Sequence, residues 1–177
     1  MPEESKKSSK ESINLGENYE VIFDDVSFKY PQSDVWALKN VTFKLSTEET
    51  TAIVGSNGAG KTTVVKLLSR LYKPTKGRIL LNGIDIEEIS IENYRPLLGV
   101  LFQDFKLFSF SIGQNISVSE TYNSEKAEKV LVEAGFLHRL ETLPLKLETP
   151  LYNDFDSNGV EISGGEAQKI AIARMLY

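Results

Sequence analysis

The sequence predicts an α/β fold that has a parallel core, an antiparallel β subdomain beside it and an α-helical insertion. Three observations predict this class. Residues 50–71 change from a β-branched apolar run, through a glycine-rich turn, to apolar positions at helical spacing. Residues 19–30 and 38–45 alternate apolar and polar side chains, as antiparallel strands do. Residues 111–143 carry helical periodicity with capping residues.

Length and composition are those of one ordinary globular domain. The chain has 177 residues, 41% of them hydrophobic and 25% charged, and its net charge is -5. Because the basic residues are scattered, we expect no nucleic-acid surface. The absence of cysteine and the single histidine exclude thiolate and multi-histidine metal sites within this chain. No apolar run reaches the roughly 18 to 20 residues that span a bilayer.

The strands are predicted from short patterned runs. Residues 1–18 are polar and mixed in charge, which predicts a flexible linker before a domain at residues 19–177. A strand follows from Tyr19 to Tyr30 and ends at Pro31, and a second strand occupies residues 38–45. Further strands are expected at residues 51–54, at 78–83 and at 99–102, the last one buried on both faces in a parallel core.

The helices are predicted from caps and periodicity. One helix begins after Lys61, and another is expected to have Ser124 as its N-cap and Gly135 as its end. Ser163 and Glu166 have capping-box spacing before a helix that offers Ile170, Ala171, Ala173 and Leu176 for packing. The helical subdomain is therefore expected at about residues 111–177.

The most specific motif is the glycine-rich turn of residues 55–62, which fulfils G-x-x-x-x-G-K-[ST]. A loop that wraps a triphosphate must point backbone N–H groups inward, which requires glycine, and the following helix N-terminus favours an anion. Lys61 would reach the β- and γ-phosphates, and the Thr62 hydroxyl would bind Mg²⁺. A plain glycine turn before a helix is the alternative. The residues expected at the nucleotide here are Gly55, Ser56, Asn57, Gly58, Ala59, Gly60, Lys61, Thr62 and Thr63.

Together the motifs resemble the nucleotide-binding domain of ATP-binding cassette (ABC) transporters of the exporter type, from Tyr19 onward. The phosphate loop, a glutamine after an apolar run, a helical insertion and I-S-G-G-E at residues 162–166, followed by Q-K-I-A-I-A-R, occur in the family's order. The resemblance implies a P-loop NTPase cassette core, truncated after the signature motif with its C-terminal strands missing. It also implies ATP and Mg²⁺ as cofactors.

The resemblance assigns roles to residues near the phosphate loop and to the loop that follows the apolar run at residues 99–102. Tyr30 is similar to the aromatic residue that stacks on adenine, although it is also in phase with core residues of its strand. Val35 would lie near the base or ribose. Gln103 resembles the Q-loop glutamine that contacts Mg²⁺ and the attacking water, with an ordinary loop glutamine as the alternative. The apolar groups of residues 103–116 would dock a transmembrane domain or pack the helical insertion.

The resemblance also assigns the second glycine motif. Ser163, Gly164, Gly165 and Glu166 would meet the γ-phosphate of ATP held by a second cassette, in a head-to-tail homo- or heterodimer. Ile162 replaces the usual leucine of the family, and Glu166 replaces the usual glutamine. Because Glu166 stands at the third helical position, it can still close a capping box.

No catalytic residue is assigned within this chain, because the Walker B aspartate, the catalytic glutamate and the switch histidine of the family lie beyond residue 177. His138 precedes the signature and is expected to be a surface or partly packed residue. We therefore expect a fragment of an exporter at the cytoplasmic face of the cell membrane, an ATPase in its intact form and inactive as a fragment. The alternatives are a soluble ABC-type regulatory ATPase and a nonhydrolytic nucleotide-binding module.

Overall fold

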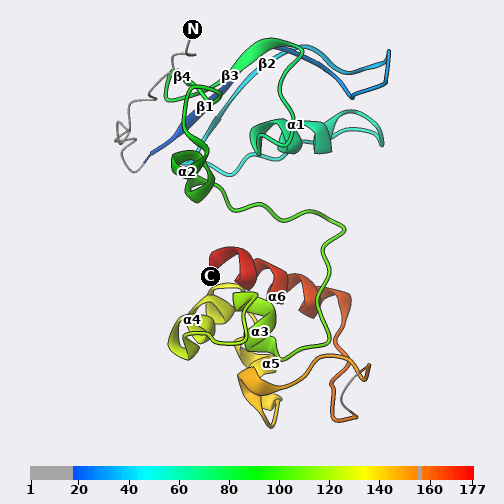
Figure 1. Cartoon of the computed structure of the whole chain (residues 1–177), viewed down its shortest axis with the longest axis vertical. Helices are drawn as coiled ribbons and strands as arrows, with labels where there is room; N and C mark the ends of the chain where they lie inside the picture. Colours follow the sequence, from blue (N-terminus) through cyan, green and yellow to red (C-terminus); the bar gives the residue numbers. More distant parts are fainter. Residues whose placement is uncertain (1–17, 155–156) are drawn as a thin grey trace, which may run out of the picture. The chain divides into compact units, whose positions relative to one another are not determined.

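The computed structural model describes residues 18–154 and 157–177, so nearly all of the predicted linker at residues 1–18 lies outside the described residues. The chain divides into two compact units, one ending at Leu98 and the other running from Gly99 to Tyr177. The first unit contains a sheet with helices, and the second is helical (Figure 1). The predicted mixed class, with an antiparallel sheet and a helical part, is confirmed.

An antiparallel sheet with strand order β2-β1-β3-β4 forms the first unit. The strands expected at residues 19–30, 38–45 and 78–83 are therefore present. The alternation is reflected in burial along β2, where Val41 and Phe43 are half-buried and Thr42 and Lys44 are exposed. The strands are β1 (Glu20–Lys29), β2 (Trp36–Ser46), β3 (Lys76–Leu81) and β4 (Ile84–Asp85).

Helical segments complete the core of the first unit. They are α1 (Lys61–Leu68), α2 (Ile91–Tyr94) and the 3₁₀ turn η1 (Arg95–Leu97). Val64 and Leu67 of α1 and Tyr94 of α2 join one cluster with the sheet residues. The Tyr94 hydroxyl donates to the Leu68 carbonyl at 2.6 Å, and burial raises the pKa of Tyr94 to about 12. The cluster contains Phe23, Val26, Phe28, Leu38, Val64, Leu67, Ile79, Leu81, Ile86, Ile89 and Tyr94.

Two predicted strands are wrong. Residues 51–54 and 99–102 have no strand structure, and Val54 is 87% exposed. A strand needs a neighbouring strand to pair its backbone N–H and C=O groups. Among the described residues, the sheet consists of β1 to β4 in antiparallel pairs, and neither segment is paired with any of them. The β-branched apolar sequence is therefore left without the partner that would make it a strand.

The second unit is a group of short helices around its own core. Of the two N-caps predicted in this unit, Ser163 is confirmed and Ser124 is wrong: the N-cap of the second helix is Asn123, whose side chain accepts from Lys126 N–H. Gly135 follows that helix with φ +73°, as expected of a C-terminal glycine. The helices are α3 (Ile112–Ser117), α4 (Ser124–Glu133), α5 (Leu137–Thr142), η2 (Lys146–Glu148) and α6 (Gly164–Leu176).

The apolar faces of these helices form the core of the second unit. From α6, Ile170, Ala171 and Ala173 are buried as expected, whereas Leu176 is 43% exposed because it lies on the outer side of the last turn. The core cluster contains Ile112, Ile116, Ala127, Val130, Leu131, Phe136, Leu140, Leu143, Leu147, Leu151, Ile170 and Ala173.

A buried polar residue, Asn115, joins α3 to the preceding loop and to α6. It is fully buried, and its amide donates to the carbonyls of Phe108 (2.8 Å), Phe110 (3.2 Å) and Ser111 (3.1 Å). Its Oδ1 accepts from Phe108 N–H at 2.8 Å and from Arg174 Nη2 at 3.1 Å. Arg174 also donates to the carbonyls of Asn115 and Lys106, at 2.7 and 2.9 Å. The side chain therefore fixes the loop against two helices.

Replacing Asn115 by leucine, of similar volume, is expected to lower the free energy of unfolding by about 3 kcal/mol, because several buried partners lose their hydrogen bonds. Urea unfolding followed by circular dichroism measures the change. Asn153→Leu, at an exposed position of the same unit, is the matched control and is expected to have little effect. Equal stability of the two variants would contradict the assigned role of Asn115.

Candidate functional site

The phosphate loop of residues 55–60 leads directly into α1. Gly58 and Gly60 have φ of +83° and +87°, which L side chains rarely adopt. The two glycines differ in their surroundings. A Cβ on Gly60 would lie 2.6 Å from Leu38 Cδ2 and 2.8 Å from the Ala37 carbonyl oxygen, whereas a Cβ on Gly58 would meet nothing within 4 Å. Gly60 therefore anchors the loop on β2, and Gly58 leaves its face open.

The N-terminus of α1 receives no hydrogen bond from a capping side chain, because its N-cap is Gly60. The next residue, Lys61, folds back over the loop: its ammonium donates to the carbonyls of Gly55 and Ser56, at 2.8 Å each. Thr62 is exposed at the same helix end. The site therefore combines uncapped N–H groups, the positive end of a helix dipole and an ammonium group.

This donor set fits a phosphate group. An uncapped helix N-terminus needs acceptors for its first N–H groups, and a phosphate oxygen is an acceptor of the required charge. The open face of Gly58 leaves space for the close approach of such a group to the backbone. The loop predicted from the sequence is thus present in a form that phosphate can complete.

Tyr30 lies beside this loop, at the end of β1. Its hydroxyl is 3.1 Å from the hydroxyl oxygen of Thr63, and its ring packs edge-on against Phe28 and Tyr72, with centroid distances of 5.0 and 5.3 Å. The Lys66 ammonium stands 5.3 Å from the centre of the ring. Tyr30 therefore both packs and reaches the first turn of α1. Val35, by contrast, is 75% exposed and lies in the connection before β2.

The other predicted residues belong to the second unit. Gln103 is exposed in a turn in which Phe105 N–H donates to the Phe102 carbonyl at 3.3 Å. His138 is an exposed residue of α5, as expected. Among the described residues, no group of three or more histidine or acidic side chains is arranged to hold a metal ion. Thr62 and Gln103, the two predicted metal ligands, each offer one side-chain oxygen, and they belong to different units.

The signature turn, Ser163 to Gly165, is exposed at the start of α6, and its predicted capping box is present. Glu166 N–H donates to Ser163 Oγ at 3.3 Å, and Ser163 N–H donates to Glu166 Oε2 at 2.8 Å. The Ser163 hydroxyl also donates to Oε2, at 2.9 Å. The backbone N–H of Ser163 lowers the pKa of Glu166, helped by this hydroxyl and by Arg139 and Lys169.

Sequence reasoning missed Arg139, which faces the signature turn. Its Nε lies 3.0 Å from Glu166 Oε1. The sequence did show a charged residue between the apolar positions Leu137 and Leu140 of a short helix. The pattern did not indicate which group Arg139 would contact. Asn115 and Arg174 were missed for the same reason: the sequence pattern shows a polar residue among apolar ones but not which groups it contacts.

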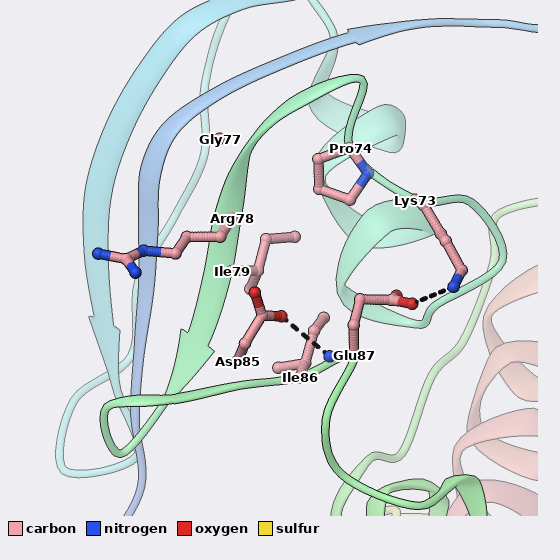
Figure 2. A pocket seen from close by; sticks show the side chains of 8 residues that line it. All are labelled: Lys73, Pro74, Gly77, Arg78, Ile79, Asp85, Ile86 and Glu87. Atoms are coloured by element: carbon pink, nitrogen blue, oxygen red, sulfur yellow. Dashed lines mark hydrogen bonds and ion pairs between the residues drawn. The ribbon is translucent and has the colours of Figure 1, made fainter. Parts of the chain in front are cut away.

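Two pockets are found among the described residues, and the larger is lined by residues of the 103–116 loop and by Gly164 of the signature turn. One, of about 450 Å³, lies in the second unit between the loop residues Phe105 to Ser109, Tyr152, Asp154 and the start of α6. The other, of about 210 Å³, lies in the first unit and is drawn in Figure 2. There Glu87 is paired with Lys73, and Asp85 Oδ1 accepts from Glu87 N–H at 3.0 Å. Arg78, which also lines this pocket, pairs with Asp24 of β1.

Alanine at Gly60 is expected to destabilise the fold far more than alanine at Gly58. Both substitutions strain a left-handed backbone, at a cost of about 1 kcal/mol, but only the Gly60 methyl group collides with β2, which adds roughly 1 to 3 kcal/mol. The midpoints of urea unfolding measure the difference. Equal losses at the two positions would show that the contact of Gly60 with Leu38 does not anchor the loop.

Glu166→Gln is expected to lower stability at neutral pH and to have less effect in acid. The folded protein holds the pKa of Glu166 below its usual value, so the contribution of the carboxylate is present above the pKa of the unfolded chain. It is lost as the pH falls through the lower, folded-state pKa. Unfolding curves of both proteins, from neutral pH into the acid range, measure this convergence. A constant difference at all pH values would contradict it.

Comparison with known proteins agrees with the two glycine motifs. A family model described as ABC transporter matches residues 38–177. The chain is 39% identical, over 96% of its length, to the mitochondrial iron-sulfur clusters transporter ATM1 of Saccharomyces cerevisiae, covering 24% of that protein. It is 35% identical, over 89% of its length, to the ATP-dependent lipid A-core flippase of Albidiferax ferrireducens, covering 27% of that protein.

A solved structure agrees as well. The structure of a bacterial Atm1-family ABC exporter with ATP bound matches with a TM-score of 0.77 and 35% identity, over 90% of this chain and 28% of that one. The chain thus spans about a quarter of the length of the relatives named here. Since the family model covers the segment from β2 to the end of α6, including both glycine motifs, the chain belongs to the ABC transporter family.

Proposed function

We propose that the chain is the ATP-binding domain of an ABC exporter, which couples ATP binding and hydrolysis in the intact protein to the export of a solute. One observation carries the proposal: the N-terminus of α1 has no capping side chain, and the ammonium of Lys61, the first residue of α1, has only loop carbonyls as partners within the described residues. Family membership and the similarity to an exporter with ATP bound support the same ligand.

In this proposal the phosphate loop binds ATP through its own backbone. The N–H groups at the start of α1 donate to the β-phosphate region, and the ammonium of Lys61 leaves the carbonyls of Gly55 and Ser56 for the phosphate oxygens. The exchange favours the anion, because a charge-assisted bond to phosphate is stronger than a bond to a neutral carbonyl.

Tyr30 would stack on the adenine ring, next to Val35. For the ring face to become free, the ammonium of Lys66 has to move from its position 5.3 Å from the ring centre. The hydroxyl contact with Thr63 fixes the ring at the loop side of α1. Mg²⁺ would be held by Thr62 and Gln103 together with phosphate oxygens, which fits the preference of Mg²⁺ for hard oxygen ligands.

The partners follow from the exposed surfaces. The signature turn, Ser163 to Gly165, would close over ATP held by a second cassette, since its N–H groups are exposed at a helix N-terminus. Phe108 and Phe110, 50% and 54% exposed, would dock a transmembrane domain. Within the described residues no helix is long and apolar enough to cross a bilayer. We propose a position at the cytoplasmic face of the membrane, next to such a domain.

Lys61→Ala is expected to weaken ATP binding roughly ten- to hundredfold, because a hydrogen bond to a charged group is lost. Titration of the protein with a fluorescent ATP analogue measures the affinity. Lys44→Ala, which removes an ammonium from an exposed position on β2, is the control and is expected to bind like the unmodified protein. Unchanged affinity of Lys61→Ala would overturn the assignment of the phosphate loop.

A further inference from the structure

The two capping boxes of the second unit have the same backbone geometry and different charges. At α3, Gln114 Oε1 accepts from Ser111 N–H at 3.1 Å, and Gln114 N–H donates to Ser111 Oγ at 3.3 Å. At α6, Glu166 stands where Gln114 stands, with corresponding distances of 2.8 and 3.3 Å. The capping box of α6 therefore contains a carboxylate, although the neutral amide of Gln114 forms the same cap at α3.

That carboxylate is held from two sides. Its Oε2 accepts both the N–H and the hydroxyl of Ser163, and its Oε1 faces Arg139 Nε at 3.0 Å. The Arg139 side chain is in turn tied to its own helix, since Nη1 donates to the Thr142 hydroxyl at 3.3 Å. Both side chains of the pair are largely covered, with 37% of Arg139 and 26% of Glu166 exposed.

Other charged groups near the pair are already occupied. The ammonium of Lys169, one turn further along α6, donates to the Gly135 carbonyl at 2.9 Å. Arg174, at the far end of the same helix, donates to the carbonyls of Asn115 and Lys106. Arg139 is therefore the cation in direct contact with the Glu166 carboxylate among the described residues.

A carboxylate at this place conflicts with the proposed ligand. The exposed N–H groups of Gly164 and Gly165 would receive a γ-phosphate, and Glu166 lies in the first turn of the same helix. Like charges repel more strongly where protein reduces the access of water. In addition, the Ser163 hydroxyl now donates to Glu166, so it has to turn toward the phosphate before it can bind it.

We propose that Arg139 is the positioning residue of the signature turn. It neutralises Glu166 and holds Oε1, so that Oε2 stays on the Ser163 N–H when the hydroxyl turns to the γ-phosphate of ATP in a second cassette. This inference rests on the proposed function, because it requires a phosphate at Ser163 to Gly165. The inference assigns a role in ATP binding at the signature turn to a residue of α5, which lies outside both glycine motifs.

A double-mutant cycle in the full-length protein tests the inference. Arg139→Met removes the charge and keeps a long side chain, and Glu166→Gln removes the carboxylate and keeps the capping box. Dyes on a cysteine introduced at the exposed Glu120, in a background from which any cysteines elsewhere in the full-length protein have been removed, report the approach of two cassettes by energy transfer. The measured quantity is the concentration of a nonhydrolysable ATP analogue, with Mg²⁺, that gives half-maximal closure.

Arg139→Met alone is expected to raise this concentration roughly tenfold, the usual size of a coupling between contacting residues. In the Glu166→Gln background the same change is expected to raise it less than about twofold, because no uncompensated carboxylate remains. Arg139→Lys should restore most of the closure. Lys129→Gln, which removes a cation from an exposed position on α4, is the control and is expected to close like the unmodified protein.

Equal losses in both backgrounds, or no loss from Arg139→Met, would overturn the role of Arg139. Binding of the analogue at protein concentrations too low for closure reports the phosphate loop alone and is expected to be unchanged by Arg139→Met. If the unmodified protein binds the analogue but never closes, the signature turn does not meet a phosphate, and the inference falls together with that part of the proposed function. If Ser163→Ala impairs closure and Arg139→Met does not, only the inference falls.

Discussion

The first N–H groups of a helix have no partner within the helix, and this constraint organises both glycine motifs of the chain. At α1 the N-cap is Gly60, so the N–H groups receive no capping side chain and remain for a ligand. At α6 the N-cap is Ser163, and its capping box with Glu166 satisfies part of the helix end internally. In the proposed function, the end of α1 would receive an anion directly, whereas the end of α6 would first release the Ser163 hydroxyl from Glu166.

The open end of α1 is kept rigid by packing rather than by capping. Gly60 lies against Ala37 and Leu38 of β2, and Val64 and Leu67 of the same helix are buried in the core of the first unit. The N–H groups consequently stay in place while the side chain of Lys61 is free to exchange carbonyls for phosphate. Preorganised donors of this kind bind an anion without the cost of ordering the loop.

In the second unit, polar contacts help to position the loop that carries the exposed aromatic residues, in addition to the packing of Leu107 on the apolar core. Asn115 binds the carbonyls of Phe108 and Phe110, and Arg174 of α6 binds both Asn115 and the Lys106 carbonyl. The helix that begins at the signature turn therefore ends on this loop.

The sequence by itself determined what depends on local chemistry. Glycines at 58 and 60, the Ser163 and Glu166 capping box, and the alternating strands at 19–30 and 38–45 are decided by backbone sterics and by short-range periodicity, and all are present. The tertiary structure decided what depends on distant partners. Residues 51–54 have strand-forming side chains but no paired neighbour among the described residues, and Arg139 of α5 pairs with Glu166 of α6 only in the folded chain. Pairing and contact across the fold require coordinates, since the residues involved are far apart along the chain.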